Sequence, residues 1–201
     1  MVLFFCLAPA VPAPSMEESA RPWLGKELET GEAVIWYLHH SGWAVRTKNH
    51  LLIFDYWPET RPPEKPSLEN GFVSPEEIKD LQVTVFVSHA HEDHFDPVIF
   101  EWEKSVPDIH YVFGWPAEEG KGRTFLAEDH AGTALNDMRI DTIHHRFDGI
   151  PEAAFLVKAD GLVIYHSGDH TCTADAPNET FRGNINSLSS LAPSVDLAFI
   201  S

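Results

Sequence analysis

Basic residues are scarce in this chain of 201 residues, which has 14 Lys and Arg against 31 Asp and Glu and a formal net charge of −17. A surface of this charge is repelled by phosphate backbones, so we expect no general nucleic-acid partner. The sequence also lacks an apolar run near the ~20 residues that a membrane-spanning helix needs. Its two cysteines are too few for a disulfide framework.

Hydrophobic residues make up 43% of the chain, which is enough for one compact domain with a buried core. From about residue 33 the sequence alternates between short β-type apolar runs and turn residues, a pattern typical of strands. We therefore expect strands over Ala33–Leu38, Trp43–Thr47, Leu51–Tyr56, Val83–Ser88, Ile109–Phe113, Met138–Ile143, Ala153–Val157, Leu162–His166 and Val195–Ile200.

Helix signals are fewer than strand signals. Ser74 and Pro75 form a helix start that leads into a helix ending near Leu81, because Ser suits the N-cap and Pro the first helical position. Asp96 and Pro97 open a second helix that runs to about Lys104, and a third is expected over Asn184–Leu191.

The first residues differ in character from the rest of the chain. Val2 to Val11 are apolar and precede a proline-broken segment, as in the hydrophobic part of a signal peptide, but no Lys or Arg occurs before Arg21. We expect residues 1–32 to be a leader or an N-terminal arm and residues 33–201 to form the domain. Export and a cytoplasmic location both stay open.

The most informative segment follows the expected strand Val83–Ser88. This β-branched, apolar run ends in His89, His91, Asp93 and His94, four metal-ligand side chains within six positions. Imidazole combined with carboxylate suits zinc, iron or manganese. A polar turn before a helix explains one or two of these residues but not all four, so the segment predicts a metal site.

This His-x-His-x-Asp-His segment resembles the signature of the metallo-β-lactamase superfamily. The resemblance implies that His89 and His91 bind one metal ion and that Asp93 and His94 bind a second. It also covers later parts of the chain, because Leu162–His166 followed by Gly168-Asp169 is similar to the family strand whose aspartate bridges the two ions. Asp93 and Asp169 are accordingly the candidate catalytic residues.

Three further features enter through the same resemblance. The family supplies another histidine to the first metal from the region that contains His144 and His145 here, and we favour His145 because it is nearer to the following loop. Asp55, at the end of an earlier strand, is expected to support the ligands. The turn His39–Gly42 is interpreted as a hairpin turn of the kind found in the branch that includes ascorbate-6-phosphate lactonase-like hydrolases.

The resemblance implies an αββα sandwich, an α+β fold, with the metal centre at one edge of its two sheets. The family completes its second metal site with a histidine beyond the strand Val195–Ile200, and this sequence stops at Ser201. We expect the last C-terminal elements to be missing through truncation. Two alternatives stay open: another histidine substitutes, or the protein works with one metal ion.

The function implied is that of a metal-dependent hydrolase in which two divalent ions activate a water molecule. We expect zinc, with manganese or iron as alternatives, and a small ester, lactone or phosphoester as substrate. Two other functions stay open: a metal-binding member that is inactive or regulatory, and a di-iron redox member of the same fold. The oligomeric state cannot be predicted from the sequence.

Overall fold

The structure is a computed structural model that describes residues 23–116, 123–125, 132–147, 149–171 and 179–200. Most of the expected leader or arm, residues 1–22, lies outside these ranges, so its nature stays a prediction. Residues 23–32 are described and pack on the domain, with Leu24 and Leu28 buried. No helix in the described part of the chain is long and apolar enough to cross a membrane.

The first of two β-sheets has six strands in the order β1-β2-β3-β4-β5-β6. Strands β1 to β3 pair antiparallel, whereas β3 to β6 pair parallel, so the carboxyl ends of β3, β4 and β5 meet at one edge. The strands are β1 (Val34–Tyr37), β2 (Trp43–Arg46), β3 (His50–Phe54), β4 (Gln82–Val87), β5 (Ile109–Phe113) and β6 (Arg123–Phe125).

The second sheet has five strands in the order β11-β10-β9-β8-β7. All neighbours pair antiparallel except β10 and β11, which are parallel. Its strands are β7 (Thr133–Leu135), β8 (Met138–Phe147), β9 (Ile150–Ala159), β10 (Leu162–His166) and β11 (Leu197–Phe199).

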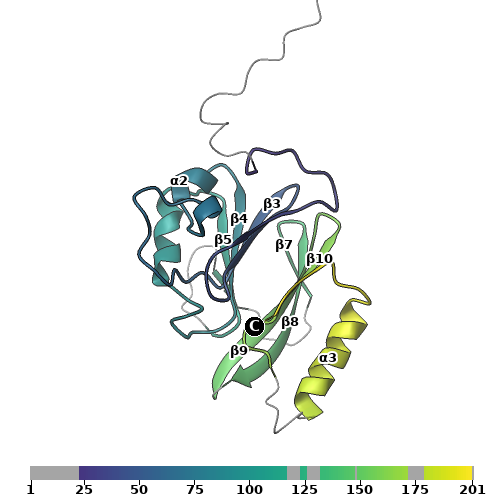
Figure 1. The fold of residues 1–201 in the computed structure, drawn as a ribbon. Coiled ribbons are helices and arrows are strands. Elements are labelled where there is room, and N and C mark those ends of the chain that lie inside the picture. Colours follow the sequence, from purple (N-terminus) through teal and green to yellow (C-terminus); the bar gives the residue numbers. More distant parts are fainter. Residues whose placement is uncertain (1–22, 117–122, 126–131, 148, 172–178, 201) are drawn as a thin grey trace, which may run out of the picture.

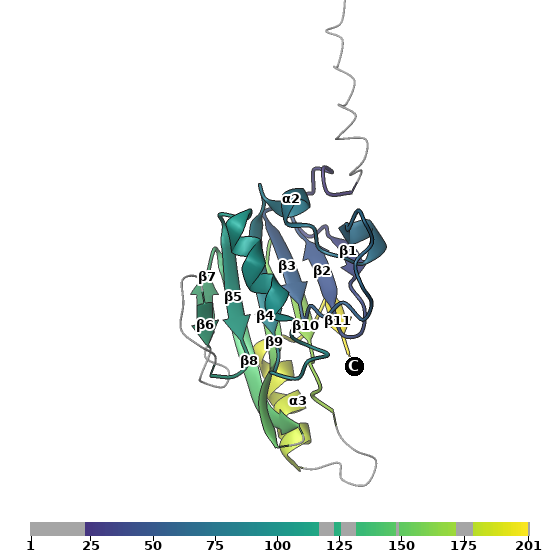
Figure 2. The ribbon, with the colours of Figure 1, turned by 90° about the vertical axis from the view of Figure 1, so that its left-hand side faces the viewer.

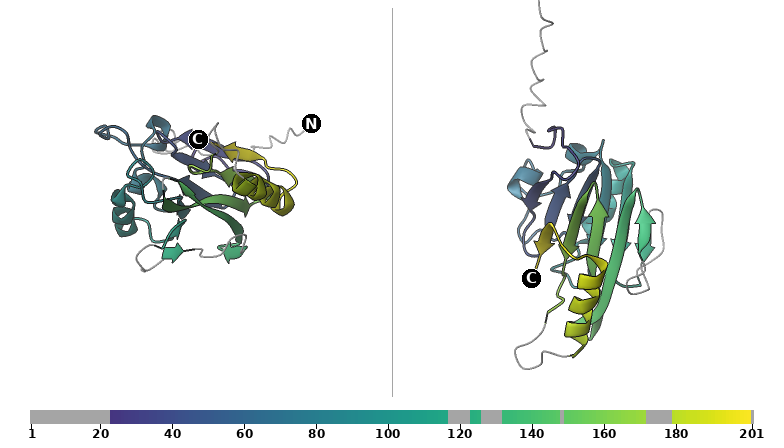
Figure 3. Two further views of the ribbon diagram at one scale, coloured as in Figure 1. Left: turned by 90° about the horizontal axis from the view of Figure 1, so that it is seen from below. Right: turned by 90° about the vertical axis from the view of Figure 1, so that its right-hand side faces the viewer.

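The sheets face each other, and helices cover their outer faces (Figure 1). The helical segments η1 (Leu68–Asn70), α2 (Pro75–Ile78) and η2 (Pro97–Lys104) lie on the first sheet, as Figure 2 shows. Helix α3 (Glu179–Leu191) lies on the second sheet, on the opposite side of the molecule (Figure 3). The four layers confirm the expected αββα sandwich.

Strand alternation explains why one sheet can bury both faces. On β3, Leu51 and Ile53 join the cluster under the helices, whereas Leu52 and Phe54 join the cluster between the sheets, because successive side chains of a strand point to opposite faces. Between the sheets, Phe54 stacks on Phe86 with ring centroids 4.8 Å apart. A third cluster, which includes Ile143 and Leu156, packs under α3.

Local structure differs from the expectation at several points. The helix expected from Ser74 to Leu81 is α helical only over Pro75–Ile78, and the one expected after Asp96 is a 3-10 helix. The third begins earlier than expected, at Glu179. Strands β6 and β7 were not expected, because three residues are too few to show a periodic pattern.

Candidate metal centre

The candidate metal-ligand side chains meet at one end of the sandwich, where strands from both sheets finish. His89, His91, Asp93 and His94 follow β4, the parallel strand between β3 and β5. Asp169 comes from the other sheet, three residues after β10. The polar segment after β4 therefore lies where the second sheet can reach it.

One group of ligand side chains contains His89, His91 and Asp169. One ligand atom from each lies within 4.8 Å of the others. His89 Nε2 is 2.9 Å from His91 Nδ1 and 3.8 Å from Asp169 Oδ2. Two ligands held ~2.1 Å from a tetrahedral zinc ion lie ~3.4 Å apart, so these separations fit a metal ion.

A second group contains His94 and Asp93, and His40 joins it from the turn between β1 and β2. Asp169 lies between the two groups. Its Oδ1 lies 3.3 Å from His94 Nε2, and its Oδ2 faces His89. His94 is fully buried, and its Nε2 faces Asp169 Oδ1 without a well-aligned hydrogen bond in the described part of the chain. A buried imidazole nitrogen that faces a carboxylate without a well-aligned hydrogen bond fits a metal ligand.

Asp55 fixes the orientation of the His94 ring through a contact with its Nδ1 atom. Its Oδ2 lies 2.8 Å from His94 Nδ1 and accepts a hydrogen bond from the Ser88 hydroxyl, while its Oδ1 accepts one from the Ser88 amide. Burial alone would raise the pKa of Asp55, but His166, His94 and Ser88 hold it below its ordinary value. An ionised carboxylate only accepts, so His94 Nδ1 carries the hydrogen and Nε2 faces the site. The expected supporting role of Asp55 matches these contacts.

His145 is the predicted ligand that the structure places in neither group. Its Nε2 lies 3.1 Å from Oε2 of Glu152, and Oε1 of the same carboxylate lies 3.5 Å from His89 Nδ1. Glu152 also accepts a hydrogen bond from the Asp169 amide. Burial would raise the pKa of Glu152, but His145 and His89 lower it to about 2. His145 thus adjoins the first group through a buried, ionised carboxylate.

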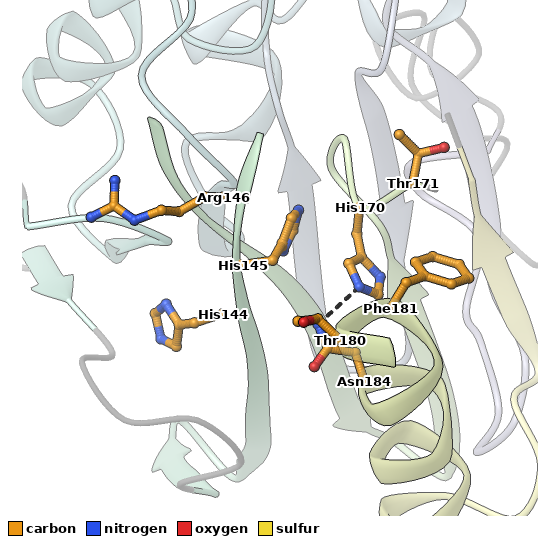
Figure 4. Close-up of a pocket in the computed structure, with 8 residues that line it drawn as sticks. All are labelled: His144, His145, Arg146, His170, Thr171, Thr180, Phe181 and Asn184. Atoms are coloured by element: carbon orange, nitrogen blue, oxygen red, sulfur yellow. Dashed lines mark hydrogen bonds between the residues drawn. The ribbon is translucent and has the colours of Figure 1, made fainter. Parts of the chain in front are cut away.

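A cavity of about 450 Å³ opens beside His145. As Figure 4 shows, His145 points toward His170, whereas His144 extends from the other side of β8. Burial, followed by repulsion from His145, lowers the pKa of His170 to about 4, so this imidazole is neutral at neutral pH. The described residues that line the cavity are His144, His145, Arg146, His170, Thr171, Thr180, Phe181 and Asn184.

Two residues of the site were missed at the sequence level. His40 was interpreted only as part of a hairpin turn, which it is: the Gly42 amide donates to the His39 carbonyl at 2.7 Å. Glu152 directly precedes the predicted strand Ala153–Val157, and no local pattern distinguishes it from an exposed residue at a strand end.

The chain matches the family model described as a β-lactamase superfamily domain over residues 34–192, and it belongs to that family. It is 30% identical over 149 residues to a UPF0173 metal-dependent hydrolase of Methanosarcina mazei. The aligned region covers 67% of this chain and 60% of the relative. A hydrolase of the same name from Dinoroseobacter shibae is 25% identical over 159 residues, covering 70% of this chain and 65% of the relative. The chain therefore spans less than two thirds of the length of these relatives.

Among solved structures, the chain is similar to CmlA, a diiron β-hydroxylase from Streptomyces venezuelae. The TM-score is 0.52 at 12% identity, covering 83% of this chain and 34% of that one. Similarity at this level supports the fold, and it carries no information about the reaction.

Proposed function

We propose that this protein is a metal-dependent hydrolase with two divalent metal ions, for which zinc is the expected metal. The observation that carries the proposal is the position of Asp169, which turns one carboxylate oxygen toward His89 and the other toward His94. A carboxylate between two groups of histidines is suited to bridge two cations.

The proposed division of the residues between the two ions is the one that the family resemblance implies. His89 and His91 hold the first ion, with His145 proposed as its third histidine, and Asp93 and His94 hold the second. The distances within the first group and the buried Nε2 of His94, which faces Asp169, support this assignment. The names of the curated relatives, metal-dependent hydrolases, support the reaction class.

When bound, divalent ions supply an activated water and polarise the oxygen of the bond to be broken. The protein's own groups position the ligands: Asp55 orients His94, and Glu152 holds the Asp169 amide and faces both His89 and His145. Fixed orientation of this kind reduces the reorganisation needed when charge develops in the transition state.

The proposed substrate is a small ester, lactone or phosphoester that occupies the cavity beside His145. A volume of about 450 Å³ is adequate for a small molecule. The lining offers hydroxyl, amide and imidazole groups, with Arg146 as its cation in the described part of the cavity. A lactone carbonyl or a single phosphoryl group matches this sparse, polar lining.

Hydrolysis assays of the zinc-loaded protein with lactone, thioester and phosphodiester substrates test the proposal. We expect turnover of at least one class, and a loss of ~100-fold in Asp169→Asn, because the bridging charge is removed. Asp137→Asn, at an exposed turn, is the matched control and should keep full activity. Equal turnover in both variants would contradict the proposal.

A further inference from the structure

The turn between β1 and β2 brings a histidine over the second group of ligand side chains. His40 Nε2 lies 3.4 Å from Asp93 Oδ2. Its ring stands perpendicular to that of His94, with centroids 5.2 Å apart. One ligand atom from each of these three residues lies within 4.8 Å of the other two. The arrangement is a second cluster of two imidazoles and a carboxylate.

The position of His40 is fixed by its turn. His39 and His40 have φ angles of 70° and 44°, in the left-handed region that few residues other than glycine occupy. The turn is closed at Gly42, where a Cβ atom would come within 2.9 Å of the carbonyl oxygens of Leu38 and His39. His166, from the other sheet, donates from Nε2 to the Ser41 carbonyl at 3.0 Å. Both sheets therefore hold the turn in place.

The neighbouring His94 gives a second, independent indication of a ligand. Its Nδ1 is committed to Asp55. Its buried Nε2 lies 3.3 Å from Asp169 Oδ1, makes no well-aligned hydrogen bond in the described part of the chain, and borders the space that His40 and Asp93 also border. A contact between the exposed side chains of His40 and Asp93 contributes little by itself. A cation shared by all three residues satisfies the carboxylate and both imidazoles together.

We infer that His40 is the third protein ligand of the second metal ion, together with Asp93 and His94. The inference rests on the proposed function, because it assumes that Asp169 separates two metal ions. A set of two imidazoles and one carboxylate takes a borderline divalent cation such as Zn²⁺, Mn²⁺ or Fe²⁺. His40 is exposed, so this ion is the one nearer to solvent.

Isothermal titration calorimetry, in which Zn²⁺ alone is added to the metal-stripped protein, tests the inference. The wild-type chain should bind two equivalents. His40→Asn should keep the first and lose the second, or bind it at least ~10-fold more weakly. Asn tolerates the left-handed backbone at this position, so the turn is retained; circular dichroism and thermal melting of the variant verify the fold.

His39→Asn is the matched control, because His39 lies in the same turn and has a left-handed backbone too, but packs its ring against Phe72, with centroids 4.9 Å apart. It should bind two equivalents. Two full-affinity equivalents in folded His40→Asn would overturn the role of His40 while leaving the hydrolase proposal intact. Failure of the wild-type chain to bind any Zn²⁺ would instead overturn the proposed function and the inference with it.

The absorption spectrum of the cobalt-loaded protein tests whether residue 40 coordinates the metal ion directly. His40→Cys loaded with two equivalents of Co²⁺ should show a thiolate-to-cobalt charge-transfer band that the wild-type chain lacks, because a soft thiolate then replaces the imidazole. His39→Cys supplies the control for a thiol in the same turn and should show no such band. Absence of the band from His40→Cys with both ions bound would contradict coordination by this residue.

Discussion

Asp55 connects the core of the first sheet to the candidate ligands. It is fully buried, it follows β3, and it has a φ angle of 41°, so the backbone turns sharply to direct the carboxylate at Ser88 and His94. His166 of the second sheet lies 3.8 Å from the same carboxylate. One ionised side chain thereby contacts groups from the end of β4, from the segment His89–His94 and from β10.

Removing the charge of Asp55 should weaken metal binding without removing a ligand. Asp55→Asn takes away the acceptor that keeps His94 Nε2 directed at the site, and loss of such a partner typically costs 10–100-fold in metal affinity. Zinc titration of the folded variant measures the effect. The exposed Asp80→Asn is the control. Equal zinc affinity in both variants would show that Asp55 does not orient His94.

His144 and His145 are adjacent, yet strand alternation gives them different surroundings. His145 pairs across the sheet with Glu152, whereas His144 pairs with Ala153. We expect His145→Ala to lose one zinc equivalent and turnover, and His144→Ala to retain both. Metal analysis of the two variants decides between them, and the reverse result would reassign the third histidine of the first ion to His144.

At the scale of elements, turns at the end of the molecule remote from the metal centre join the two sheets. Asp160, between β9 and β10, accepts hydrogen bonds from the Thr47 hydroxyl and the Asn49 amide, each at 2.7 Å. Its carbonyl accepts a bond of 2.9 Å from the Gly31 amide. These contacts tie the hairpin of the first sheet and the segment before β1 to the hairpin of the second.

The hydrogen bonds of Asp160 predict that the difference in stability between the wild-type chain and an Asp160 variant depends on pH. Burial alone would raise the pKa of Asp160, but the bonds from Thr47 and Asn49 lower it below its ordinary value. A lowered folded-state pKa means that the stabilisation is present above the unfolded-state pKa of ~3.9 and is lost as pH falls through the folded-state value.

Asp160→Asn should therefore lower the free energy of unfolding by about 1 kcal/mol at pH 7. The difference from the wild-type chain should shrink below about pH 4. Asn tolerates the φ angle of 48° at this position, so the backbone is not the cause. Urea unfolding of both proteins at the two pH values measures this. A difference independent of pH would contradict the account.

The elements that sequence could predict are those with a local signal. Long apolar strands such as β4 and β10 show their pattern within one run, and the four candidate ligand residues after β4 fall within six positions. His40 and Glu152 reach the site only through the pairing of distant strands, which no local pattern encodes. The 3-10 geometry of η2 was not predictable either, because residues three apart, here Ile99 and Trp102, share a face in both helix types.

At the scale of the whole molecule, the candidate centre draws its ligands from both sheets. His89 and His94 belong to the first sheet and Asp169 to the second, so ions bound among them cross-link the two halves of the sandwich. A ligand that binds only the folded chain stabilises it by mass action.

Zinc should accordingly raise the melting temperature of the protein. At a free zinc concentration 100 times the Kd the gain is ~2.7 kcal/mol, which corresponds to roughly 5–10 °C for a chain of this size. Differential scanning calorimetry with zinc and with a chelator measures the shift. The double variant His89→Ala, His91→Ala should show less than half of it, and an undiminished shift would place the stabilising metal elsewhere.

The metal content of the purified protein, determined by inductively coupled plasma mass spectrometry, tests the central claim most directly. The account predicts two equivalents of a divalent transition metal per chain, with one or both lost from the double variant His89→Ala, His91→Ala. A folded wild-type chain that takes up no metal from zinc-containing buffer, or a double variant with undiminished stoichiometry, would contradict it.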